Sequence, residues 1–284
     1  MIESASPVAG EWTALQHLKG DTTVAVAIPA RNEEATVGGI VAAIGRHLVE
    51  VGLVDEVVVL DHASTDRTGQ VARDAGALVV DADAVLPEFG PAVGKGDVLW
   101  RALAATEADL IMYCDADLKV FDPYRFIRLT GPLLADDSVH LVKSTGDRIL
   151  HGRHGEGGRT TMLAARPILN LLHPDAAHLT QPLGGEYAGR RSALMSVPYE
   201  VDYGVEIGLI IDIARRYGAR AVTEVETGPR AHGSQPLAAL SQQAEQVLRT
   251  ALLRAGMDVA GPIPQPRPPM SRALADPVSV ASST

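Results

Sequence analysis

The sequence has little cysteine and no long apolar run, and both absences narrow the classes of protein that it can encode. Its 284 residues include one cysteine, Cys114, so no disulfide can form within the chain, which suits a reducing compartment. No stretch approaches the roughly 20 apolar residues that span a bilayer. The N-terminus also lacks a charged region followed by an apolar one. We therefore expect a cytoplasmic protein without a membrane partner.

Net positive charge is missing as well. The formal net charge is -10, and neutralising a nucleic-acid backbone needs a basic face, so we expect no nucleic-acid partner. Small anions are still allowed, because they need only a local cluster of arginine and histidine. Neither G-x-x-x-x-G-K-[ST] nor G-x-G-x-x-G after the first apolar run is present. Their absence argues against kinases, NTPases and dinucleotide-dependent dehydrogenases.

What the sequence does contain is a regular alternation of apolar runs and helical patterns. Short apolar runs rich in β-branched residues predict buried strands, and the amphipathic stretches between them predict helices. The predicted strands are residues 24–29, 55–60, 77–80 and 109–114, and the predicted helices are 32–50, 65–75 and 95–105. This order predicts βαβ units and a mostly parallel sheet flanked by helices, which is an α/β fold.

Polar residues follow three of these predicted strands, at 29–33 (PARNE), 61–66 (DHASTD) and 115–117 (DAD). The carboxyl ends of parallel strands meet at one sheet edge, where the ligands of such folds bind. Asp115 and Asp117 would point to the same side, roughly 7 Å apart. Their hard oxygens suit Mg²⁺ or Mn²⁺, which also bind diphosphate. The alternative interpretation of this pair is a solvated turn that caps a helix.

Further candidate residues lie outside these clusters. Lys95, between two glycines, is either a phosphate contact or part of an ordinary loop. Residues 155–161 (GEGGRTT) combine glycines with Arg159, which favours anion binding but is equally typical of a flexible loop. Glu206 lies in an apolar helical pattern, where it either binds a polar group or caps the helix. His232 is either structural or completes a metal site with the aspartates.

Together these segments resemble the glucosyl-3-phosphoglycerate synthase family, which are retaining glycosyltransferases of the GT-A fold. The likeness runs from about residue 24 to 256 and rests on the order of PARNEE, VLDHASTD, GKGD, DAD, GGRTT, QPLGGEYAGRR, YGVEIGLIID and RAH. It implies a Rossmann-like GT-A fold with a C-terminal acceptor-binding portion. It further implies transfer of glucose from a UDP-sugar donor, UDP-glucose, to 3-phosphoglycerate or a similar small anionic acceptor. Mg²⁺ or Mn²⁺ would be the cofactor, and the protein would be a homodimer.

The resemblance also implies roles for individual residues. The donor-binding residues would be Pro29, Ala30, Asn32, Glu33, Asp61, Ser64, Lys95, Asp115 and Ala116. The acceptor-binding residues would be Gly158, Arg159, Thr161 and Arg230. The metal ligands would be Asp115, Asp117 and His232. The catalytic group would be Asp117, His232, Glu206 and Leu183, with Glu206 meeting the sugar hydroxyls and Leu183 lying beneath the sugar.

The same patterns predict how the chain is divided. We expect an N-terminal arm over residues 1–20, a nucleotide-sugar-binding half over 21–130 and an acceptor-binding half over 131–258. Residues 259–284 are predicted to form a disordered tail, because they include the proline-rich segment GPIPQPRPP (261–269).

Four alternative functions stay open. A glycosyltransferase of a specialised natural-product pathway would use another anionic acceptor or nucleotide-sugar. A sugar-phosphate nucleotidyltransferase would use the same aspartates and metal, but it should carry a Gly-rich, Arg-containing loop after the first strand. A polyprenyl-phosphate sugar transferase is disfavoured by the lack of a membrane segment. A non-catalytic nucleotide-sugar-binding protein is disfavoured by the intact Asp-x-Asp pair.

Overall fold

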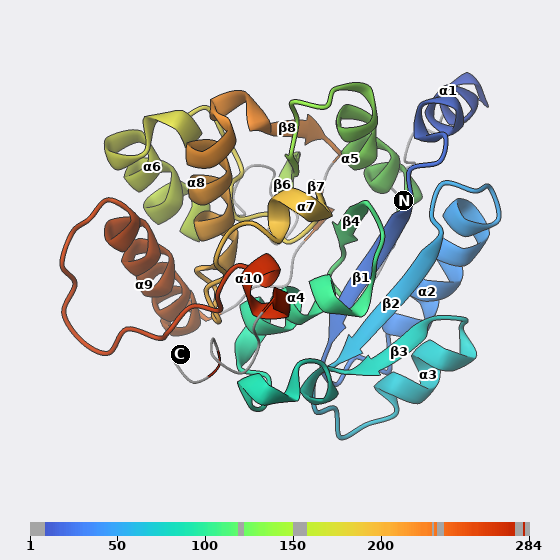
Figure 1. Cartoon of the computed structure of the whole chain (residues 1–284), viewed down its shortest axis with the longest axis horizontal. Coiled ribbons are helices and arrows are strands. Elements are labelled where there is room, and N and C mark those ends of the chain that lie inside the picture. Colours follow the sequence, from blue (N-terminus) through green and yellow to red (C-terminus); the bar gives the residue numbers. More distant parts are fainter. Residues whose placement is uncertain are drawn as a thin grey trace.

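The computed structural model describes residues 9–118, 122–149, 158–228, 230–231, 236–275 and 281. Its centre is a seven-stranded sheet with the strand order β3-β2-β1-β4-β7-β5-β8 (Figure 1). These strands are β1 (Val24–Ala30), β2 (Glu56–Asp61), β3 (Leu78–Asp81), β4 (Leu110–Tyr113), β5 (Leu141–Thr145), β7 (Tyr187–Arg190) and β8 (Val222–Glu226). β7 is antiparallel to β4 and β5, whereas the other pairs are parallel. The predicted mostly parallel α/β fold is confirmed.

Helices connect the strands and cover both faces of the sheet. They are α1 (Ala9–Lys19), α2 (Val37–Ile44), α3 (Thr68–Asp74), α4 (Gly94–Ala105), α5 (Pro123–Ala135), α6 (Arg166–Leu172), α7 (Arg191–Leu194), α8 (Val205–Tyr217), α9 (Leu237–Arg254) and α10 (Met270–Ala275). Two short strands, β6 (Arg148–Ile149) and β9 (Arg230–Ala231), form a separate parallel pair. Within the described part of the chain, no helix is long and apolar enough to cross a membrane.

The four predicted strands and three predicted helices of the first half occur in the expected order, with one clear difference in bounds. The helix predicted from residue 32 begins at Val37 instead. Asn32 has φ of 58°, in the left-handed region, so it cannot be part of a right-handed helix. Backbone N–H groups of Thr36 and Val37 bond the Glu33 carbonyl oxygen, which makes a turn of residues 33–36.

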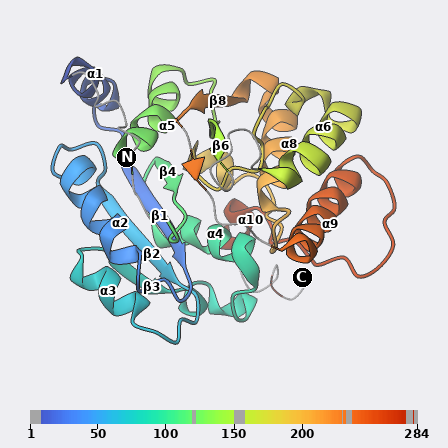
Figure 2. The same cartoon turned by 180° about the vertical axis from the view of Figure 1, so that it is seen from behind.

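Alternation along each strand divides the core between the two faces of the sheet. In β1, Val24, Val26 and Ile28 point to the side covered by α2, α3 and α5. Ala27 points to the opposite side, where it joins the apolar cluster of α4, α8, α9 and α10. Figures 1 and 2 show α2 and α3 on one side of the strands and α4 with α10 on the other. Because both faces are buried, the strands are continuously apolar in sequence, as predicted.

The C-terminal segment differs from the prediction of disorder. Residues 259–275 are described, and Arg267 pairs in antiparallel fashion with Tyr199 through two backbone hydrogen bonds. Met270 and Ala273 of α10 are fully buried in the apolar cluster that includes α4 and α8. The proline-rich composition indicated disorder, but these two apolar side chains and the Arg267 contacts hold the segment against the core. The prediction of a disordered tail is therefore wrong for residues 259–275.

Candidate active site

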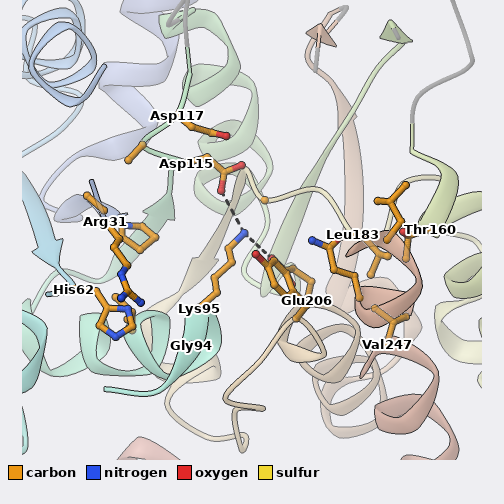
Figure 3. A pocket seen from close by; sticks show the side chains of 18 of the residues that line it. Arg31, His62, Gly94, Lys95, Asp115, Asp117, Thr160, Leu183, Glu206 and Val247 are labelled. Atoms are coloured by element: carbon orange, nitrogen blue, oxygen red, sulfur yellow. Dashed lines mark hydrogen bonds and ion pairs between the residues drawn. The ribbon is translucent and has the colours of Figure 1, made fainter. Parts of the chain in front are cut away.

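A cavity of about 610 Å³ lies at the carboxyl edge of the sheet (Figure 3). Its walls come from the ends of β1, β2 and β4, the start of α4, the loop before β7, and helices α8 and α9. The predicted site residues that line it are Pro29, Ala30, Glu33, Lys95, Asp115, Ala116, Asp117, Gly158, Arg159, Thr161, Leu183 and Glu206. Segments that are far apart in sequence therefore meet at one cavity, at the edge where parallel sheets bind ligands.

Lys95 lies at the centre of this cavity between two carboxylates. Its Nζ is 3.3 Å from Asp115 Oδ1 and 3.0 Å from Glu206 Oε1, as the dashed lines of Figure 3 show. Burial lowers the pKa of Lys95, but Asp115 and Glu206 raise it more, so its pKa lies above the usual range and the ammonium stays charged. Glu206, at the first turn of α8, is only 5% exposed and is matched by this cation. The sequence left Glu206 either to bind a polar group or to cap the helix, and the structure shows that it binds Lys95.

Asp117 and Glu33 form an acidic rim on the other side of Asp115. Asp117 is exposed at the cavity. Burial raises the pKa of Glu33, and the nearby Asp117 and Asp66 carboxylates raise it further, whereas a hydrogen bond from Thr36 lowers it. Negative charge is thus concentrated at the end of β4, where a cation would be attracted. Among the described residues, no group of three His, Cys, Asp or Glu side chains is arranged to hold a metal ion.

The loop before β7 brings its backbone directly against Asp115. A Cβ atom added at Gly185 would lie 2.5 Å from Asp115 Oδ2 and 2.7 Å from Oδ1, so a side chain there would displace the carboxylate or the loop. Two buried contacts support the loop from below. Lys143 Nζ donates to the Gly184 carbonyl oxygen at 2.6 Å, and Arg125 pairs with Glu186 at 3.1 Å. The loop that contains Leu183 is therefore held by two charged contacts.

Three of the predicted donor residues do not line the cavity. Asn32, Asp61 and Ser64 instead connect the loops after β1 and β2. Asn32 N donates to Ser64 Oγ at 3.0 Å, Thr65 N donates to Asn32 Oδ1 at 2.8 Å, and Ser64 N donates to Asp61 Oδ1 at 3.2 Å. These hydrogen bonds hold the loop that follows Pro29 and Ala30, which do line the cavity.

The predicted acceptor residues lie at the opposite end of the cavity. Gly158 has φ of 71°, and its carbonyl oxygen accepts from Met162 N at the π-helical turn Thr161–Ala165. Arg159 and Thr161 line the cavity next to it. Arg230 belongs to β9, where only the backbone is described. His232 lies outside the described residues.

Sequence reasoning missed several lining residues. Arg31 and His62 lie within the predicted clusters 29–33 and 61–66 but were given no role, and Tyr203 begins the YGVEIGLIID segment, so their positions in these motifs were available signals. Helix α9 contributes Leu240, Gln243 and Val247, spaced along one side of the helix. The polar Gln243 between the apolar Leu240 and Val247 was the available signal of a cavity wall.

A mostly parallel sheet, with an Asp-x-Asp pair at its carboxyl edge beside a paired lysine, is typical of glycosyltransferases of the GT-A fold. Residues 25–179 match the model of the family Glycosyl transferase family 2. A glucosyl-3-phosphoglycerate synthase of Mycolicibacterium smegmatis is 48% identical over 88% of this chain and 84% of its own length. That of Petrotoga mobilis is 38% identical over 83% of this chain and 74% of its own. The chain belongs to the glucosyl-3-phosphoglycerate synthase family.

Solved structures of this family superpose on the whole fold. The Mycobacterium tuberculosis enzyme in complex with Mn²⁺, UDP-glucose and phosphoglyceric acid has a TM-score of 0.84 and 39% identity, covering 96% of this chain and 97% of that one. The same enzyme with Mg²⁺ and UDP has a TM-score of 0.84 and 38% identity, covering 95% and 97%. The GT-A fold expected from the sequence is confirmed.

Proposed function

We propose that this protein transfers glucose from UDP-glucose to 3-phosphoglycerate, with retention of configuration and with Mg²⁺ or Mn²⁺ as cofactor. The observation that carries the proposal is the Asp115–Lys95–Glu206 chain in a cavity whose two ends differ in chemistry. One end has the acidic rim of Asp117 and Glu33, and the other has Arg159 beside Gly158. Relatives that share 38–48% identity over most of the chain are named for this reaction, which supports the proposal.

Asp115 and Asp117 fit a divalent cation that is shared with a diphosphate. Both lie at the cavity, and hard carboxylate oxygens suit Mg²⁺ and Mn²⁺, which keep other positions for water and phosphate oxygens. The described residues offer no group of three protein ligands. We propose His232 as a further protein ligand, as the family resemblance implies. When bound, the metal would stabilise the negative charge of the departing diphosphate.

The donor would lie along the edge of β1, β2 and β4. In this proposal Pro29, Ala30, Glu33 and Ala116 contact the uridine, and Asn32, Asp61 and Ser64 hold that wall in place. Lys95 meets the diphosphate and donor sugar with Asp115, Glu206 accepts hydrogen bonds from sugar hydroxyls, and Leu183 supports the sugar from below. Figure 3 shows Lys95 between the aspartates and Glu206, which is where the diphosphate and the sugar would join.

The acceptor would lie against residues 158–161, with Arg230 nearby. A positive φ at Gly158 turns the chain into the helical segment that contains the π-helical turn Thr161–Ala165, and the N-terminal end of a helix carries partial positive charge. An anion is favoured at such a place, and Arg159 offers two parallel N–H donors to a phosphate or carboxylate. In a retaining transfer the acceptor hydroxyl attacks from the leaving-group face, and its proton passes to the departing phosphate. The chain then contributes orientation and charge rather than an in-line base.

Acceptor-dependent release of UDP tests this function. Purified protein is mixed with UDP-glucose and Mn²⁺, with and without 3-phosphoglycerate, and the anomeric proton of the product is assigned by NMR. We expect UDP release that requires both metal and acceptor, and an α-linked glucosyl product. A β-linked product would refute retention. Equal UDP release with and without the acceptor would refute the acceptor assignment.

We also propose a cytoplasmic homodimer, with a donor half over 21–130 and an acceptor half over 131–258. Both halves contribute walls to the cavity, which supports this division.

Leu163 and Leu171 are 80% and 77% exposed and lie eight residues apart along two consecutive helical segments. An apolar side of this kind supports contact with a second copy. Light scattering measures the mass, and a monomer at micromolar concentration would exclude the dimer.

A further inference from the structure

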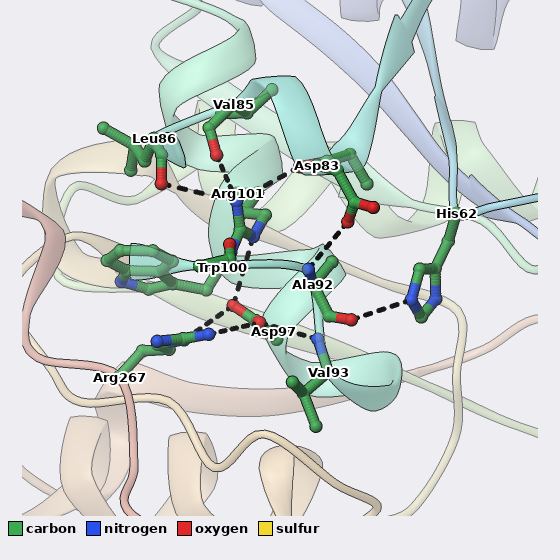
Figure 4. A network of polar contacts seen from close by, with 12 residues as sticks. His62, Asp83, Val85, Leu86, Ala92, Val93, Asp97, Trp100, Arg101 and Arg267 are labelled. Atoms are coloured by element: carbon green, nitrogen blue, oxygen red, sulfur yellow. Dashed lines mark hydrogen bonds and ion pairs between the residues drawn. The ribbon is translucent and has the colours of Figure 1, made fainter. Parts of the chain in front are cut away.

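The C-terminal segment reaches the cavity indirectly, through a buried network that surrounds Asp97. Asp97 is fully buried in α4, two residues after Lys95. Arg267 binds it with two parallel hydrogen bonds, Nε to Oδ1 at 2.8 Å and Nη2 to Oδ2 at 2.7 Å. Arg101 adds a longer contact to Oδ1 at 3.4 Å (Figure 4). The bidentate pair with Arg267 is therefore the dominant partner of this buried carboxylate.

Asp97 in turn holds the start of the helix that carries Lys95. Its Oδ2 accepts a hydrogen bond from Val93 N at 2.8 Å, so the carboxylate closes the first turn of α4 from within. The N–H groups of Gly96 and Asp97 both donate to the Val201 carbonyl oxygen, at 3.1 and 3.4 Å. The first turn of α4 is thus tied to the segment that leads into α8, where Glu206 lies.

Arg267 also holds that second segment. Its backbone N–H donates to the Tyr199 carbonyl oxygen at 2.7 Å, and its carbonyl oxygen accepts from Tyr199 N at 3.0 Å. The chain continues from Tyr199 through Val201 to α8. One residue therefore contacts α4 with its side chain and the start of the α8 segment with its backbone. These two segments carry Lys95 and Glu206, whose ion pair crosses the cavity.

We propose that Arg267 is a positioning residue for the transfer reaction, which sets the geometry of Lys95 and Glu206 from outside the cavity. This inference rests on the proposed donor site. Arg267 does not line the cavity, so it acts through Asp97 and Tyr199 and not through the substrate. Other contacts of the segment, such as Met270 in the core and the Trp100 Nε1 bond to the Pro268 carbonyl oxygen, stabilise its packing without reaching Asp97 through a charge.

Arg267→Gln tests this role, because it removes the cation and keeps the backbone pairing with Tyr199. Calorimetry measures the Kd for UDP with Mn²⁺, and steady-state assays separate kcat from the KM of each substrate. We expect UDP affinity to fall about tenfold, because a displaced Lys95 would lose one charge-assisted contact to the diphosphate. The KM for 3-phosphoglycerate should change by less than about twofold. Arg267→Lys keeps the positive charge but cannot make two parallel hydrogen bonds to Asp97. It should therefore bind UDP more tightly than Arg267→Gln and less tightly than wild type.

Met270→Ala is the matched control, since it weakens the packing of the same segment and keeps Arg267. It should lower the melting temperature while UDP affinity stays within about twofold of wild type. In a Lys95→Ala background, Arg267→Gln should weaken UDP binding by less than about twofold more, because the effect passes through Lys95. If Arg267→Gln only lowers the melting temperature, or if Met270→Ala weakens UDP binding equally, the positioning role is refuted. UDP binding does not depend on which acceptor is used, so this result is separable from the proposed reaction.

Discussion

Replacing Gly185 by alanine tests how closely the cavity holds Asp115. The new Cβ would lie 2.5 Å from Asp115 Oδ2, whereas a comfortable non-bonded contact needs about 3.5 Å. The carboxylate or the loop must therefore move by about 1 Å, and a misplacement of that size at a reacting centre costs about 100-fold in rate. Gly185 is not among the described glycines with positive φ, so alanine adds no left-handed backbone strain. We expect kcat/KM for UDP-glucose to fall about 100-fold.

The assay is steady-state UDP release at saturating 3-phosphoglycerate, together with a thermal unfolding curve. Gly39→Ala in α2 is the matched control, because its Cβ would meet nothing within 4 Å. That variant should keep wild-type turnover and gain up to about 1 kcal/mol of stability, since alanine is the better helix former. A loss of less than about tenfold for Gly185→Ala would show that Asp115 is not held as tightly as the structure indicates.

Three further predictions concern the metal, the acceptor and the core. Asp117→Asn should abolish Mn²⁺-dependent turnover without lowering the melting temperature, because Asp117 is exposed; near-normal turnover would undo the metal assignment. Arg159→Ala should raise the KM for 3-phosphoglycerate far more than that for UDP-glucose, and equal increases would contradict an acceptor role. Arg254→Met should cost about 3–5 kcal/mol in urea unfolding, because it leaves the buried Glu200 and the partly buried Asp212 without their cation. Burial raises the pKa of Glu200 and Arg254 lowers it, so removing Arg254 raises this pKa further and the folded variant binds the proton more readily than the folded wild type. The deficit should therefore shrink as pH falls from neutral towards the unfolded pKa, and a deficit that grows on acidification would refute this explanation.

Much of the first half could be predicted from sequence because its signals are local. A strand buried on both faces must be continuously apolar, so β1, β2 and β4 are visible as runs of such residues. The βαβ order then places the ends of these strands at one edge. The grouping of Pro29, Asp115 and Asp117 at one cavity followed from that rule without any knowledge of side-chain positions.

The predictions failed where composition and tertiary contacts disagree. The segment after residue 259 is rich in proline, which is typical of disordered chains, yet Arg267 and Met270 hold it to the core. A few long-range contacts outweigh a compositional tendency when one of them pairs a fully buried carboxylate. Similarly, α2 begins later than predicted, because the Asn32 backbone has a left-handed φ and its N–H bonds to Ser64 in the loop after β2.

By itself, the sequence determined the order of the elements, the sheet edge at which the ligand cavity forms and the residue types available there. Those properties depend on periodicity and chain order, which a linear sequence contains. Only the tertiary structure decided that Lys95 would join Asp115 to Glu206, that Gly185 would have no room for a side chain, and that Arg267 would reach Asp97. These contacts span many residues of chain, and their geometry follows from the packing of whole helices against the sheet rather than from any local pattern.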